Sequence, residues 1–174
     1  MTSIDRRAFL ARTAAAGAAA ALAGIGLGPA LAAEPLVKGL PNVEKLGWRV
    51  GFSAYTFRAL TAFEALDQIA ATGLRYAEMF SWQKLSPKHP DATTSPELSK
   101  PLRGELKAKA AGCGVKMIGL YSTMGNRATA EAAFEFAADM GIEVIVGEPP
   151  ADLFEYIDSL AAKHKVNFAL HNHP

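Results

Sequence analysis

The chain has 174 residues, of which 50% are hydrophobic, and a formal net charge of +1. This composition is typical of a globular protein with one domain. The near-neutral, interspersed charge excludes the usual basis for binding nucleic acid or an anionic membrane. The single cysteine, Cys113, excludes an intramolecular disulfide.

Residues 1–33 are organised as an export signal. Arg6 and Arg7 are followed by an apolar pair, which resembles the twin-arginine signal. Residues 13–33 are uncharged, and Ala30-Leu-Ala32 matches a small-x-small cleavage site. The uncharged stretch is long enough to span a bilayer, but its alanine and glycine favour a cleaved signal over an anchor. We therefore expect the twin-arginine export machinery as a partner and a periplasmic or secreted location.

After a predicted linker over residues 34–46, strand and helix patterns alternate through a predicted domain over 47–174. The five predicted strands are apolar runs bounded by turn residues, at 48–57, 74–80, 115–121, 142–147 and 166–170. The proline-rich segment 81–101 predicts a long loop.

Helices are predicted between these strands from their end signals. Thr61-Ala-Phe-Glu64 and Asp152-Leu-Phe-Glu155 are two capping boxes. Gly73 is predicted to end the first helix. A further helix is predicted over 102–111, and another begins at Asn126 or Thr129.

Such alternation predicts a parallel sheet with right-handed crossovers. Two architectures are compatible with it. One is a partial (β/α)8 TIM barrel covering strands 1–5, since a full barrel needs about 250 residues. The other is an open five-stranded parallel α/β sheet, which the chain length favours. The residues at the strand ends favour the barrel.

Polar side chains gather where the predicted strands end. In the last strand, Val166, Phe168 and Leu170 share an apolar face, whereas His171 and His173 continue the opposite face. The carboxyl ends of parallel strands meet at one edge, which is where active sites form. The candidate residues there are Tyr55, Glu78, Tyr121, Glu148, His171 and His173.

Carboxylates and imidazoles together suit a divalent metal or acid–base chemistry. Structural explanations also exist for each residue. Glu78 suits a solvated turn, Gly147-Glu-Pro-Pro150 suits a backbone turn, and a single histidine is often structural. The tyrosines suit a pocket wall better than an acid.

Four segments together resemble the sugar phosphate isomerase/epimerase family, within the xylose isomerase-like TIM barrel superfamily. They are Gly51-Phe-Ser-Ala-Tyr-Thr-Phe57, Tyr76-Ala-Glu-Met-Phe80, Gly147-Glu-Pro-Pro150 and Ala169-Leu-His-Asn-His-Pro174. The resemblance implies that residues 47–174 are the N-terminal portion of such a barrel.

The family resemblance also implies a function. We expect a metal-dependent isomerase or epimerase that abstracts a proton beside the carbonyl of a small-molecule sugar or polyol. Glu148 and His171 are the implied catalytic and metal-binding residues, and Tyr55, Glu78 and His173 the implied substrate contacts. The implied metal is Mn, Zn, Co or Mg, expected only with a complete barrel.

The chain departs from the family pattern in two ways. His171 occupies the place where many relatives have a metal-binding glutamate, and the other expected ligands belong to strands six to eight. The alternatives are therefore a keto-sugar dehydratase or lyase of the same superfamily, and a non-catalytic carbohydrate-binding remnant. Unpaired sheet edges also predict a homo-oligomer.

Overall fold

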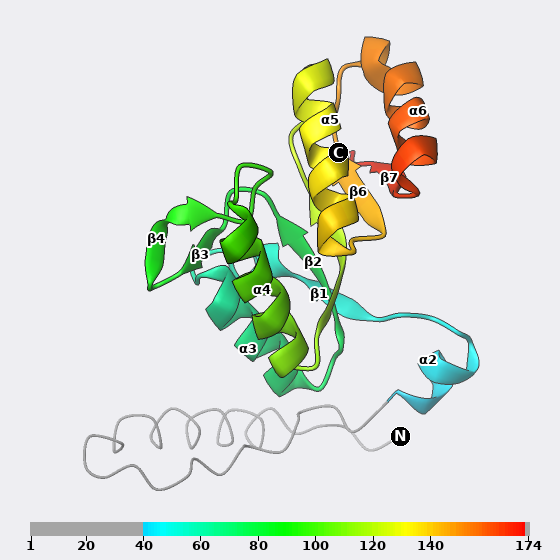
Figure 1. Ribbon diagram of the computed structural model, residues 1–174. Coiled ribbons are helices and arrows are strands. Elements are labelled where there is room, and N and C mark those ends of the chain that lie inside the picture. The colour runs from blue at the N-terminus through cyan, green and yellow to red at the C-terminus, as the bar shows by residue number, and fades with distance from the viewer. Residues whose placement is uncertain (1–39, 173–174) are drawn as a thin grey trace, which may run out of the picture. The chain divides into compact units, whose positions relative to one another are not determined.

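The computed structural model describes residues 40–172 (Figure 1). The predicted signal, most of the predicted linker and the candidate residue His173 lie outside these residues. The described end of the linker contains a short helix, α2 (Pro41–Lys45). The sequence did not predict this helix, because the linker has no clear hydrophobic periodicity. Across residues 40–172, no helix has the length and apolar character needed to cross a membrane.

A five-stranded parallel sheet forms the centre of the α/β fold (Figure 1), as the alternating pattern predicted. Its spatial order, β1-β2-β5-β6-β7, is also the order of these strands along the chain. The strands are β1 (Gly51–Ser53), β2 (Tyr76–Phe80), β5 (Lys116–Tyr121), β6 (Val144–Gly147) and β7 (Asn167–Leu170).

The two faces of this sheet differ in burial. Met79, Leu120 and Ile145 are aligned across β2, β5 and β6 and are at most 2% exposed. Glu78 and Tyr121, which alternate with them along the strands, are only half-buried. One face therefore supplies the core, and the other presents polar groups.

Four helices connect the parallel strands and pack on the core. They are α3 (Ala62–Thr72), α4 (Lys100–Gly112), α5 (Arg127–Met140) and α6 (Phe154–His164). Their largest fully buried side chains include Leu66, Ile69, Leu106, Phe134 and Ile157.

Two of the predicted helix starts are confirmed. The Thr61 side chain accepts a bond from the Glu64 amide, and the Glu64 carboxylate accepts one from the Thr61 amide at 2.9 Å. The Asn126 side chain caps α5 in the same reciprocal way with Thr129. Gly73 ends α3 in the left-handed conformation, with φ of 85°, which a residue without a Cβ adopts at little cost.

The predicted capping box at Asp152 is wrong. Residues Ala151–Leu153 form a 3-10 turn, η2, and α6 begins only at Phe154. No side chain caps that start. The preceding Pro150 has extended backbone, and the chain enters the helix through the tighter turn.

The predicted first strand, 48–57, is too long. β1 contains three residues, and Ala54–Phe57 form a 3-10 helix, η1. The Ser53 side chain accepts a bond from the Tyr55 amide, so it competes with continuation of the strand. The turn brings Tyr55 to the end of the sheet.

The segment 81–101 is not a plain loop. It contains an antiparallel hairpin of β3 (Lys84–Ser86) and β4 (His89–Thr93). Pro90 is compatible with β4 because each strand of a two-stranded sheet has a free edge where a missing N–H costs nothing. Buried Leu85 and Thr94 attach the hairpin to the core.

Candidate functional site

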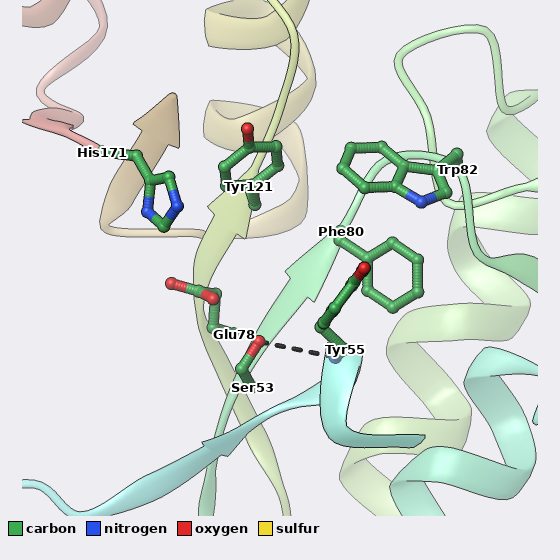
Figure 2. Close-up of a pocket in the computed structure, with 7 residues that line it drawn as sticks. All are labelled: Ser53, Tyr55, Glu78, Phe80, Trp82, Tyr121 and His171. Atoms are coloured by element: carbon green, nitrogen blue, oxygen red, sulfur yellow. Dashed lines mark hydrogen bonds between the residues drawn. The ribbon is translucent and has the colours of Figure 1, made fainter. Parts of the chain in front are cut away.

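An open pocket of about 260 Å³ lies at the carboxyl end of the sheet. Figure 2 shows the seven residues that line it: Ser53, Tyr55, Glu78, Phe80, Trp82, Tyr121 and His171. They come from the ends of β1, β2, β5 and β7 and the turns that follow. Four of the candidate residues, Tyr55, Glu78, Tyr121 and His171, thus line one space.

A continuous row of rings runs around the pocket from one side to the other. Tyr55, Phe80, Trp82, Tyr121 and His171 make successive edge contacts, with ring centroids 5.1–5.4 Å apart. Edge-to-face pairs of this kind contribute about 0.5–1.5 kcal/mol each. In Figure 2, the Tyr55, Phe80 and Trp82 rings lie opposite the Glu78 carboxylate and the His171 imidazole. A ligand would therefore meet an apolar surface on one side and polar groups on the other.

The predicted residue Glu148 is exposed and does not line the pocket, but it is bonded to the lining residue Tyr121. The Tyr121 hydroxyl donates a hydrogen bond of 2.6 Å to Oε1 of Glu148. This bond, together with desolvation and the carboxylate charge, raises the pKa of Tyr121 to about 12. The protonated phenol fixes one carboxylate oxygen. Tyr121 is thus a wall residue, as expected, and it also orients Glu148.

Gly147 permits the close backbone approach on which this arrangement depends. A Cβ at Gly147 would lie 2.6 Å from the carbonyl oxygen of Ser122 and 3.1 Å from Cε of Met124. The Gly147 carbonyl also accepts a bond of 2.9 Å from the His171 amide. One glycine therefore brings the segment after β5, Glu148 and His171 together.

Sequence reasoning missed Phe80 and Trp82 as pocket residues. Both continue the alternation that begins at Glu78, so their side chains point to the same side at the end of β2. That spacing of two was the available signal. Trp82 remains 49% exposed, which leaves much of its ring accessible to a ligand.

The described residues do not supply a complete metal site. Between residues 40 and 172, no group of three or more His, Cys, Asp or Glu side chains is arranged to hold an ion. The predicted pair, Glu148 and His171, would provide two donors, whereas a catalytic zinc ion takes three protein ligands. The metal therefore stays a prediction, and no chemical step below depends on it.

Comparison with known proteins gives a structural relative. A crystal structure of an uncharacterized protein from Parabacteroides distasonis superimposes with a TM-score of 0.69 at 32% sequence identity. The match covers 73% of this chain and 54% of the relative, so the chain spans about half the relative's length. No protein-family model and no curated protein matches the chain.

Proposed function

We propose that the pocket binds a sugar or polyol and moves a proton on the carbon beside its carbonyl group, as in a sugar isomerase or epimerase. The observation that carries the proposal is the Glu148 carboxylate, which Tyr121 holds beside an aromatic pocket at the strand ends. Aromatic rings pack against the C–H faces of a sugar, and carboxylates accept hydrogen bonds from its hydroxyls.

Glu148 is the proposed base. Its carboxylate would take a proton from the carbon next to the carbonyl, and the electron pair of the C–H bond would form an enediolate. Delivery of a proton to the other face by a second acid, while Glu148 keeps the first proton, would give an epimer. Return of the Glu148 proton to the neighbouring carbon on the same face, with a proton moved between the two enediolate oxygens, would give an isomer. Tyr121 is a positioning residue in this scheme, because its hydroxyl holds Oε1 of Glu148. Tyr55, Glu78 and His171 would contact the substrate's hydroxyl and carbonyl groups.

The order of the strands supports the inference that this sheet is the first part of a (β/α)8 barrel. In open doubly wound sheets the strand order reverses at a switch point, and ligands bind there. Here the spatial order follows the chain without reversal. Barrel strands follow one another in the same way, with the active site at their carboxyl ends.

Two alternatives remain within this proposal. The same proton abstraction followed by loss of a β-hydroxyl would make the protein a keto-sugar dehydratase. The second alternative is a domain that binds carbohydrate without catalysing a reaction, which needs no complete set of metal donors among the described residues. Residues 1–33 support export through the twin-arginine route in every case.

Deuterium exchange tests the proposed proton transfer. The full chain is incubated with ketoses in D₂O and, in parallel, with added Mn²⁺, and loss of the proton NMR signal beside the carbonyl is followed. Glu148→Gln is expected to slow exchange by about 10²–10⁴-fold, the usual contribution of a positioned base. Glu155→Gln, an exposed carboxylate on α6, is the control. Saturable binding without exchange would support the binding domain instead.

A further inference from the structure

Buried polar side chains gather behind the aromatic rings of the pocket. Four polar side chains are buried in the part of the chain that the structure describes, and three of them, Gln83, Ser86 and Thr94, belong to the segment with the β3–β4 hairpin. Each of the three is at most 3% exposed. Gln83 directly follows Trp82, whose ring lines the pocket. Buried polar groups are costly unless hydrogen bonds compensate them, so their partners indicate what they hold in place.

The side chain of Gln83 joins the segment with Trp82 to the segment with Tyr55. Its Nε2 atom donates to the carbonyl of Leu60 at 3.1 Å and to the carbonyl of Phe57 at 3.4 Å. Phe57 is the last residue of η1, the turn that contains Tyr55. Oε1 of Gln83 is buried and has no hydrogen-bond partner among the described residues. The two bonds donated by Nε2 therefore fix the orientation of the amide.

The backbone on both sides of Trp82 is also held. The Ser81 amide donates to the Tyr121 carbonyl at 3.0 Å, and the Gln83 amide donates to the Phe80 carbonyl at 3.3 Å. The Trp82 ring is 49% exposed and makes edge contacts with the rings of Phe80 and Tyr121. The position of this ring therefore depends on the backbone at 81–83, which the Gln83 side chain ties to η1.

We propose that Gln83 is a positioning residue, which sets the separation of the Trp82 and Tyr55 rings and hence the width of the pocket. Phe80 lies between these two rings, with centroids 5.4 Å from Tyr55 and 5.1 Å from Trp82 (Figure 2). A ligand on this aromatic surface packs against rings from both segments, so their separation affects its binding. The inference rests on the proposed function for the ligand alone, since the position of Trp82 can be measured without one.

Time-resolved fluorescence tests the position of Trp82 in the absence of a ligand. The full-length chain has two tryptophans, so Trp48→Phe leaves Trp82 as the only one. In this background, Gln83→Met removes both donated bonds at a similar side-chain length. We expect the anisotropy decay of Trp82 to gain a nanosecond component, because side chains that are not held move on that timescale.

Ser86→Ala is the matched control. Ser86 is buried in the same hairpin and accepts a bond of 3.3 Å from the His89 amide, within the hairpin itself. This variant therefore loses a buried hydrogen bond without affecting the link to η1. It should leave the anisotropy decay of Trp82 unchanged. Far-UV circular dichroism on each variant shows whether the fold is retained.

Deuterium exchange with D-fructose and D-xylulose measures the consequence for the ligand. Gln83→Met should raise KM by about 3–10-fold, which corresponds to the loss of one aromatic packing contact. It should change kcat less than KM, because packing on the rings is the same in the ground state and the transition state. In a Trp82→Ala chain, the same substitution should have almost no effect on KM, since Gln83 acts through that ring.

Three results would overturn the inference. They are an anisotropy decay that Gln83→Met leaves unchanged, a decay that Ser86→Ala changes equally, and a KM effect of Gln83→Met that persists in full in Trp82→Ala. If Gln83→Met does not fold, NMR on the wild type decides instead. The Nε2 protons of Gln83 should exchange slowly with solvent, and rapid exchange would refute the two donated bonds.

The ligand-free measurements separate this inference from the proposed function. Absence of deuterium exchange in the wild type would refute the proposed proton transfer, while the anisotropy decay would still decide the role of Gln83. Exchange in the wild type together with an unchanged decay in Gln83→Met would do the reverse.

Discussion

Gly147→Ala tests whether close backbone approach builds the site. The added Cβ would lie 2.6 Å from the Ser122 carbonyl oxygen, so β6 must move away from the segment after β5. That movement strains or breaks the bond of 3.0 Å from the Ser122 amide to the Val146 carbonyl. Overpacking costs about 1–3 kcal/mol and a lost hydrogen bond about 0.5–1.5 kcal/mol, so we expect about 2–4 kcal/mol of destabilisation.

Urea unfolding at 25 °C measures this loss as a lower midpoint with an unchanged slope. Gly104→Ala is the matched control, because a Cβ there meets nothing within 4 Å and the residue is exposed on α4. Alanine in a helix interior should stabilise the protein by about 0.5–1 kcal/mol. Equal midpoints for Gly147→Ala and the wild type would refute the reasoning.

Four further predictions concern the three residues Tyr121, Thr61 and Lys165. In a spectrophotometric titration, one tyrosine should ionise at about pH 12, and Glu148→Gln should return it toward the ordinary value. Because folding raises the pKa of Tyr121, the stabilising contribution of this residue is present below pH 10 and is lost as the pH rises toward 12. The unfolding midpoint should therefore fall more steeply between pH 10 and 12 in the wild type than in Tyr121→Phe. Thr61→Ala should cost about 1 kcal/mol through loss of the α3 cap, measured by urea unfolding, and an unchanged midpoint would contradict the role of that cap. Lys165→Gly should stabilise the protein by about 0.5–1 kcal/mol, because φ at Lys165 is 55° and glycine adopts that conformation without strain. This gain would appear as a higher urea midpoint. A lower midpoint would show that the lysine side chain contributes more to stability than its backbone strain costs.

Local patterns were sufficient to predict the central sheet and most of the pocket. Alternation within β2 and β7 fixes the faces on which Glu78 and His171 lie, and parallel strands bring their ends together. The reciprocal cap at Thr61 is likewise a local signal, since both partners lie within one turn. These features depend on residues that are close together in the sequence, so a local pattern is sufficient to predict them.

The β3–β4 hairpin depends on distant contacts and could not be predicted in this way. Gln83 donates from Nε2 to the Leu60 carbonyl at 3.1 Å, and Thr94 donates from Oγ1 to the Phe80 carbonyl at 2.6 Å. These bonds join segments separated by one or more elements. The orienting bond from Tyr121 to Glu148 is non-local too, so alternation alone indicated a wall residue and gave no sign of its partner.

The agreement between spatial and sequential strand order bears on how the chain acquires its structure. Within the five-stranded sheet, each strand after β1 pairs with the parallel strand that precedes it along the chain. During synthesis, every new strand therefore finds its partner already made, and the sheet can lengthen one βα unit at a time.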